Sequence, residues 1–299
     1  MTVQVTRPPS ALPRPSAMLE VLKPVTWFPP MWAYLCGVVS SGVSVWDNAG
    51  LALLGVILAG PIVCAMSQAA NDWCDRHVDA INEPHRPIPS GRLPGRWGLW
   101  IALFMTGLGL VVGWQLGPWG FGATVLAVLA AWAYSAEPVR LKRSGWWGPG
   151  VCGLSYEALP WITGAAVMAA GAPAWEVMAI AVLYGLGAHG IMTLNDFKAL
   201  EGDRQMGLNS LPVTLGPERA ARLACWVMAV PQILVVGLLV GWDRPWHALG
   251  VLGVLFAQGL LMRRLLADPK GRAPWYNGTG IVLYVSGMMV TAFALGGLA

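Results

Sequence analysis

Long apolar stretches, separated by short polar segments, run along most of the chain. A helix that crosses a bilayer needs about 20 mostly apolar residues. Nine stretches reach this length, at approximately 27–46, 49–70, 97–115, 118–136, 147–170, 174–195, 218–241, 245–266 and 276–298. Several of them contain Pro or Gly, which membrane helices tolerate. The pattern predicts an all-α integral membrane protein, built as a single bundle of nine transmembrane helices.

The segment before the first apolar stretch has a different composition. Residues 1–25 are rich in Pro, contain Arg7, Arg14 and Lys23, and lack the apolar core of a signal peptide. We therefore expect a cytoplasmic N-terminal arm at 1–25 and a single transmembrane domain at 26–299.

Basic residues are confined to alternate polar segments. Eighteen of the 19 Lys and Arg residues lie in the arm or after the second, fourth, sixth and eighth stretches, and Arg244 alone lies on the other side. Because cytoplasmic loops are enriched in Lys and Arg, this asymmetry predicts a cytoplasmic N-terminus. The net charge of +4 follows from this topology, and no nucleic-acid partner is needed to explain it.

The overall composition supports a membrane protein and excludes an ordinary soluble one. Hydrophobic residues make up 56% of the chain and charged residues only 11%, against about 25% charged in soluble domains. The five cysteines are scattered without a CxxC pair, so the sequence predicts neither a disulfide framework nor a zinc site.

Acidic residues are concentrated in two short segments that follow the second and sixth stretches. Seven of the 15 Asp and Glu residues lie within 72–83 or 196–203. Asn71, Asp75 and Asp79 are spaced by four residues, so on a continued helix they share one face, about 6 Å apart along the axis. Oxygen ligands in such a row suit Mg²⁺, which takes one or two carboxylates and completes its shell with water and phosphate oxygens.

The simpler interpretation is that these acids only solvate helix ends. Their spacing, and the recurrence of a similar segment 124 residues later, favour a shared ligand instead. Both segments begin with Asn-Asp, contain Asp-Arg and lead into a Pro-containing stretch. Two such ends facing each other would clamp a polyanion through metal ions, in a central cavity that opens at the cytoplasmic side. The expected metal ligands are Asn71, Asp75, Asp79, Asn195, Asp196, Glu201 and Asp203.

Basic side chains lie among and after these acids. The bias of cytoplasmic loops explains some of them. A diphosphate, however, carries about three negative charges near neutral pH, and metal ions with Arg and Lys are the usual compensation for phosphate oxygens. The expected diphosphate contacts are Arg76, Arg86, Arg140, Lys142, Lys198 and Arg204.

At these residues the sequence resembles the UbiA superfamily of membrane prenyltransferases. The family's NDxxDxxxD motif matches residues 71–79, and its DxxDxEGD motif resembles residues 196–203, where Ala199 replaces the middle Asp. Its Tyr and Lys motif resembles Tyr134 with Lys142 at a looser spacing. The resemblance covers essentially the whole chain and implies nine helices, Mg²⁺ as cofactor and a prenyl diphosphate as donor. The catalytic residues that it implies are Asp72, Asp75, Asp79, Tyr134, Lys142, Asp196 and Asp203.

Within this superfamily the chain is most similar to the chlorophyll and bacteriochlorophyll synthase family. Residues 71–84, 134–142, 155–161 and 195–198 carry this resemblance, and the tryptophan-rich segments around them resemble the bacteriochlorophyll branch. The resemblance implies esterification of the 17-propionate of bacteriochlorophyllide a with a geranylgeranyl or phytyl group, in bacteriochlorophyll biosynthesis. It also implies a place in the inner membrane, either cytoplasmic or intracytoplasmic photosynthetic.

A carboxylate acceptor is already ionised at neutral pH, so it requires placement near the reacting carbon rather than a general base. Two polar residues within apolar stretches are weaker candidates for the acceptor pocket. Glu157 either bonds to the acceptor or is a structural acid that keeps its proton. His189 either binds the Mg of a chlorin or bonds to a neighbouring helix.

Three alternatives stay open on the sequence alone. A prenyltransferase for chlorophyllide, a quinone precursor or haem would have the same donor motifs. A transporter built from repeats would also explain nine spans with paired Asn-Asp segments, although carriers usually bind ions near the middle of the bilayer and these acids lie at one face. A pigment scaffold without activity is the third, and the complete set of donor residues disfavours it.

Overall fold

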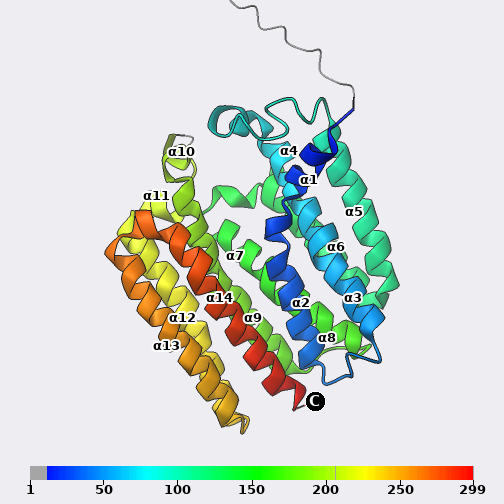
Figure 1. Ribbon diagram of the computed structural model, residues 1–299, viewed down its shortest axis with the longest axis vertical. Helices are drawn as coiled ribbons and strands as arrows, with labels where there is room; N and C mark the ends of the chain where they lie inside the picture. Colours follow the sequence, from blue (N-terminus) through cyan, green and yellow to red (C-terminus); the bar gives the residue numbers. More distant parts are fainter. Residues whose placement is uncertain (1–11, 206, 299) are drawn as a thin grey trace, which may run out of the picture.

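The structure is a computed structural model that describes residues 12–205 and 207–298, and within them no β-strand occurs (Figure 1). The α-helices are α1 (Pro15–Leu22), α2 (Phe28–Ser40), α3 (Ala49–Ile57), α4 (Ala65–Asn82), α5 (Trp97–Gln115), α6 (Gly117–Ser135), α7 (Trp147–Gly153), α8 (Leu159–Met168), α9 (Trp175–Asn195), α10 (Leu200–Gln205), α11 (Leu211–Leu215), α12 (Pro217–Gly241), α13 (Pro245–Ala267) and α14 (Pro269–Gly296). Five shorter segments of tighter or wider helix are η1 (Pro24–Thr26), η2 (Leu58–Cys64), η3 (Leu141–Arg143), η4 (Leu154–Ala158) and η5 (Asp196–Lys198). The predicted all-helical class is confirmed.

Each predicted apolar stretch contains a helix or a run of consecutive helices. Six runs in the described part of the chain are long and apolar enough by themselves to cross a membrane, and the protein is a multi-pass membrane protein. These runs are Ala49–Asn82, Trp97–Gln115, Trp175–Lys198, Pro217–Gly241, Pro245–Ala267 and Pro269–Gly296.

Two of the helical runs are interrupted by π-helical turns, and proline explains their positions. Pro61 lies inside η2, and Pro160 follows η4 at the start of α8. Proline has no backbone N–H, so it cannot complete the regular hydrogen bond to the carbonyl four residues earlier. The wider turns change the direction of the side chains that follow, and such turns occur frequently at functional sites. Both segments line the same cavity, described below.

Helix α1 lies within the segment predicted as an N-terminal arm. Residues 1–11 of that arm lie outside the described residues. Ala17 and Val21 of α1 are buried, and Glu20 accepts a hydrogen bond from Arg92 of the loop after α4. This ion pair lowers the pKa of Glu20, because the Arg92 guanidinium stabilises the carboxylate. Lys23 ends α1 in the left-handed region, with φ of 47°, and the chain then turns into η1 and α2.

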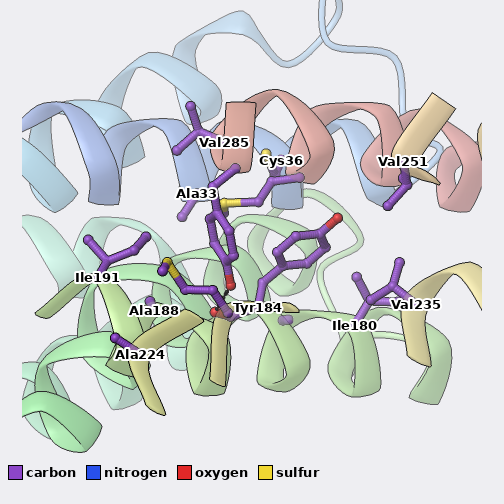
Figure 2. Close-up of a cluster of buried hydrophobic side chains, with 14 of the residues drawn as sticks. Ala33, Cys36, Ile180, Tyr184, Ala188, Ile191, Ala224, Val235, Val251 and Val285 are labelled. Atoms are coloured by element: carbon purple, nitrogen blue, oxygen red, sulfur yellow. Dashed lines mark hydrogen bonds between the residues drawn. The ribbon is translucent and has the colours of Figure 1, made fainter. Parts of the chain in front are cut away.

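Aromatic and small residues fill the core between α2, α9 and α14. Tyr184 stacks on Trp161 and contacts Tyr284 edge-on, with ring centroids 5.6 and 5.4 Å apart. Figure 2 shows Tyr184 among the buried side chains of this core. The Tyr284 hydroxyl donates to the Tyr184 carbonyl at 2.6 Å, and the hydroxyls of Tyr184 and Thr291 lie 3.0 Å apart. The buried hydroxyls of Tyr184, Tyr284 and Thr291 therefore have partners within the protein, as a membrane interior favours.

Glycines allow α2 and α8 to approach closely. A Cβ added at Gly37 would lie 2.0 Å from the Trp161 carbonyl oxygen, and one at Gly164 would lie 2.3 Å from the Tyr34 carbonyl oxygen. Both obstacles are backbone atoms, which cannot rotate away. Membrane helices commonly associate through such small residues, since lipid provides no hydrophobic force that drives one helix onto another.

Gly37→Ala should therefore destabilise the protein, because the two helix backbones must separate to admit the methyl group. We expect a loss of about 1–3 kcal/mol, the usual cost of overpacking, seen as a lower midpoint of thermal unfolding in detergent. Gly122→Ala on α6 is the matched control, because its Cβ would meet nothing within 4 Å. Equal midpoints for the two variants would contradict this account of the interface.

Candidate active site

Helix α4 carries the first acidic segment as predicted, and both acidic segments lie at the same end of the bundle. Figure 1 shows the C-terminal end of α4 and helix α10 at the end opposite to the C-terminus of α14. A Cβ added at Gly202 of α10 would lie 3.3 Å from the Asn82 side-chain nitrogen at the end of α4. The two segments, distant in sequence, are therefore in close contact.

Asp72 and Asp79 lie two helical turns apart and share basic partners. The Lys23 amino group lies 2.6 Å from Asp72, whose side chain is only 3% exposed. The Arg86 guanidinium lies 3.0 Å from Asp79 and 3.6 Å from Asp72. Burial opposes the charge on Arg86, but Asp79 and Asp72 raise its pKa overall. Two carboxylates on this side of α4 are thus neutralised by two cations.

Asp75 faces the loop after α6. Its two oxygens contact Arg140 at 2.9 Å and Lys142 at 2.5 Å. Burial lowers the pKa of Lys142, and the adjacent Asp75 carboxylate offsets part of that effect. Arg140 adopts a φ of 37°, a left-handed conformation that costs energy for a residue with a side chain and that can accompany a functional constraint. The loop thus holds two cations against one carboxylate.

The expected single row of ligands on α4 is divided between two directions. Asn71 donates to the Ser135 hydroxyl at 3.3 Å on the same side as Asp75, whereas Asp79 groups with Asp72. In residues 12–205 and 207–298, no three Asp, Glu, His or Cys side chains lie together in a ready-made metal cage. Because each α4 carboxylate has a basic partner, like-charge repulsion is already relieved by side chains.

Two carboxylates of the second acidic segment lie on α10, beyond the end of α9, and one of them is buried while the other is exposed. Asp203 on α10 is buried, and this burial raises its pKa although Ser210 partly offsets the shift. Glu201 is exposed and pairs with Arg204 at 3.4 Å. Asp196 starts η5, directly after α9. Of the three acids, Asp203 is thus held inward and Glu201 lies at the surface.

Several other predicted residues lie around this centre. Lys198 and Ala199 are exposed. Arg76 donates to the Trp73 carbonyl and lies over the Trp73 ring, 4.1 Å from its centroid, so it remains on its own helix. Asn195 accepts a hydrogen bond from Asn277 of α14 at 2.7 Å.

Tyr134 lies where the acidic segments meet. Its hydroxyl is close enough to Asp75, Asp196 and Asp203 for each to act on it electrostatically. The basic loop and the loop after α10 are also joined through their backbones, because Gly145 donates to the Asn209 carbonyl at 2.9 Å. Two acidic segments, a tyrosine and a basic loop therefore form one polar centre.

An apolar cavity adjoins this polar centre. Its volume is about 400 Å³, within the range of small-molecule sites, and Asn71, Tyr134 and Asn195 belong to its lining. The rest of the lining is mostly apolar and comes from both π-helical segments and from helices along the bundle. The arrangement combines a site for a polyanion with space for an apolar chain.

The two candidates for the acceptor pocket differ in position. Glu157 lines the cavity and is 4% exposed. His189 is not among the lining residues: its ring lies 5.8 Å from the Trp146 ring, and Nδ1 lies 3.3 Å from the Thr193 hydroxyl. The structure therefore places Glu157 at the cavity and His189 between α9 and α7.

Sequence reasoning missed three groups of this site. Lys23 contacts Asp72, but in the sequence it is one of several basic residues of the arm. Asn277 contacts Asn195 from a helix without any motif. Gln68 donates to the Tyr156 hydroxyl at 2.8 Å, and both side chains belong to the cavity lining. Of these three residues, only Gln68 could have been found from the sequence. It lies one helical turn before Asn71, which indicates that the polar face of α4 extends beyond the acidic motif.

Comparisons with known proteins agree with this architecture. The sequence profile described as the UbiA prenyltransferase family matches residues 26–292. The chain is 66% identical over 298 residues to the bacteriochlorophyll synthase 33 kDa chain of Cereibacter sphaeroides, covering 100% of this chain and 99% of that protein. It is 44% identical to the bacteriochlorophyll synthase 34 kDa chain of Chloroflexus aurantiacus, and the match covers 93% of this chain and 89% of that protein. It is 37% identical to the chloroplastic chlorophyll synthase of Oryza sativa, and the match covers 92% of this chain and 76% of that protein.

Solved structures show the same fold at low sequence identity. A UbiA homolog from Archaeoglobus fulgidus bound to GPP and Mg²⁺ superposes with a TM-score of 0.69 at 20% identity, covering 90% of this chain and 99% of that one. A structure of digeranylgeranylglyceryl phosphate synthase superposes with a TM-score of 0.70 at 21% identity, covering 94% of this chain and 97% of that one. The profile match and the full-length relatives together show that the chain belongs to the UbiA prenyltransferase family.

Proposed function

We propose that this prenyltransferase is a bacteriochlorophyll synthase, which esterifies the 17-propionate of bacteriochlorophyllide a with a geranylgeranyl or phytyl group from its diphosphate. The observation that carries the proposal is the convergence of two acidic segments and a basic loop beside an apolar cavity. The acceptor is proposed from relatives that are 66% identical over the full chain and bear this name. These relatives do not favour a transporter.

The polar centre fits Mg²⁺ by the chemistry of its donors, which are carboxylate and amide oxygens. The residues proposed to hold it are Asn71, Asp75, Asp79, Asn195, Asp196 and Asp203, with Glu201 at the exposed rim. When bound, Mg²⁺ supplies a Lewis acid that makes diphosphate a better leaving group. A basic side chain already contacts each α4 carboxylate, which indicates that positive charge is favourable at these positions.

The chain's own basic residues stabilise the charge that develops on the departing diphosphate. Lys142 and Arg140 adjoin Asp75, and Arg86 and Lys23 adjoin Asp72. Fixed cations in a partly buried site stabilise a developing negative charge more strongly than cations in water do, and they need no reorganisation during the reaction. Lys198, Arg204 and Arg76 are proposed as outer members of this basic set.

The cavity accommodates the hydrocarbon chain of the donor and excludes water from the allylic carbon. Tyr134 lies at the boundary between this cavity and the carboxylates, so we propose that its hydroxyl orients the reacting end of the donor. The acceptor carboxylate is ionised at neutral pH and needs only placement beside that carbon.

We also propose nine membrane crossings, with the arm and the polar centre at the cytoplasmic face of the inner or intracytoplasmic membrane. The distribution of basic residues supports this orientation. The domain at 26–299 is then a single catalytic unit.

Purified protein incubated with Mg²⁺, geranylgeranyl diphosphate and bacteriochlorophyllide a should release diphosphate and form the pigment ester, identified by mass. Asp75→Asn and Asp203→Asn should each lower kcat by about 100-fold or more, the scale of losing one electrostatic group at a reacting centre. Asp47→Asn, an exposed acid outside the site, is the matched control. Full turnover by both site variants in saturating Mg²⁺ would refute the proposed roles.

Lys23→Met should destabilise the protein in Mg²⁺-free detergent, because the buried Asp72 would keep only Arg86 at 3.6 Å. We expect a loss of about 1.5–3 kcal/mol in the free energy of unfolding, typical of a hydrogen bond to a charged group. Arg143→Met is the control, since its 2.6 Å pair with Glu137 is half exposed and such pairs contribute about 0–1 kcal/mol. A Lys23 variant as stable as the wild type would show that this pair contributes nothing.

A further inference from the structure

Glu157 is a buried acid in the wall of the cavity. Its Oε2 is fully buried without a hydrogen bond, and no hydrogen bond or ion pair to this side chain is found in residues 12–205 and 207–298. The Cys36 and Cys152 thiols and the Tyr284 hydroxyl lie near enough for electrostatic interaction with Glu157, and such side chains are uncharged at neutral pH. The Tyr284 hydroxyl already donates to the Tyr184 carbonyl.

Glu157 therefore carries its proton. An ionised carboxylate in an apolar environment, without a cation or several donors, is far too costly, and such groups become neutral instead. A protonated carboxylic acid presents one O–H donor and an acceptor oxygen. The cavity wall thus offers a hydrogen-bond donor that no group in the described part of the chain accepts.

Among the fully buried polar side-chain atoms without a partner in residues 12–205 and 207–298, Glu157 Oε2 is the one that belongs to the cavity lining. Tyr156, the residue before it in η4, also lines the cavity, and its hydroxyl accepts from Gln68. Thr163, one helix further on, lines the cavity as well and donates to the Leu159 carbonyl at 2.6 Å. These two neighbouring hydroxyls are therefore satisfied by the protein.

The position of Glu157 is fixed by its π-helical segment. Gly153 and Gly185 hold η4 against α9, since a Cβ at Gly153 would lie 2.6 Å from the Gly185 carbonyl oxygen. Such close backbone contact leaves η4 little freedom to turn Glu157 toward another protein group. A rigid, unsatisfied donor in a cavity is complementary to a ligand atom that accepts hydrogen bonds.

The two substrates of the proposed reaction differ in what they offer to this donor. The hydrocarbon part of a prenyl diphosphate has no hydrogen-bonding atom and would leave Glu157 unsatisfied. Bacteriochlorophyllide a carries carbonyl groups on its ring system, including a ketone on the fifth ring and an acetyl group where chlorophyllide a has a vinyl group.

We propose that Glu157 donates a hydrogen bond to a ring carbonyl of the acceptor, which is distinct from the carboxylate that is esterified. This inference rests on the proposed function. It is a specificity-determining residue for acceptors that are carbonyl-bearing tetrapyrroles. A site that bonds a polar group discriminates against analogues lacking it, because its own buried donor is then left unpaired.

Three variants test this role. Glu157→Leu removes the donor at similar volume, and Glu157→Gln keeps an N–H donor. The control Thr279→Val removes a hydroxyl that already donates to the Trp275 carbonyl and is not part of the cavity lining. We expect Glu157→Leu to raise KM for bacteriochlorophyllide a about 10-fold, the scale of one neutral hydrogen bond, without changing KM for the prenyl diphosphate. Glu157→Gln should retain most of the affinity, and Thr279→Val should match the wild type.

Chlorophyllide a identifies which carbonyl is bound. If Glu157→Leu affects only bacteriochlorophyllide a, the acetyl group is the partner; if it affects both acceptors equally, the shared ring ketone is. An unchanged acceptor KM in Glu157→Leu would overturn the proposal, and so would a changed donor KM. A structural role would instead lower the unfolding temperature of Glu157→Leu, whereas replacing an unpaired buried acid with leucine should preserve or raise it.

A spectroscopic measurement keeps this proposal separate from the proposed function. Resonance Raman spectra of bacteriochlorophyllide a bound to the protein, without donor, should show a carbonyl stretch lowered by hydrogen bonding that returns upward in Glu157→Leu. This result would hold even if no ester formed, in which case the proposed reaction alone would fail. Identical carbonyl frequencies in wild type and Glu157→Leu would exclude the hydrogen bond.

Discussion

Neutralisation of a carboxylate cluster at one end of a membrane bundle is the constraint on which this structure depends. Asp72, Asp75 and Asp79 lie on one helix, where unpaired charges would repel each other and resist burial. The chain brings cations to them from three separate segments, with Lys23 from the arm, Arg86 from the loop after α4 and Lys142 from the loop after α6. The loops at this end are therefore organised around the acids.

The same charge balance explains how a polyanionic substrate reaches a site beside lipid. Under the proposed function, the basic side chains that pair with these carboxylates would exchange internal ion pairs for contacts to metal and diphosphate when the donor binds. The apolar cavity begins where Asn71, Tyr134 and Asn195 border these charges. A substrate with a charged head and a hydrocarbon tail matches this division, and the polar wall at Glu157 adds a contact for an acceptor with ring oxygens.

Periodicity and spacing in the sequence predicted the features that depend on local structure. The apolar stretches are helical, and α4 continues through the acidic motif. The recurrence of the acidic segment also predicted one tertiary contact, the one between the two segments. The other features that the sequence did not predict depend on tertiary contacts or on the exact helical period. A period of 3.6 residues per turn rotates positions spaced by four around the helix, so Asp79 lies with Asp72 rather than with Asp75. Only the fold shows that Lys23 and Asn277 reach the site and that His189 lies outside the cavity lining.

The central claim is that the two acidic segments act on one ligand. Its most direct test is a double-mutant cycle on the Mg²⁺-dependent binding of an unreactive thio analogue of geranylgeranyl diphosphate, with Asp75→Asn, Asp203→Asn and the double variant. The account predicts strong coupling, so that the double variant binds about as weakly as the weaker single variant. Fully additive losses of binding free energy would show that the two carboxylates act independently and would contradict the account.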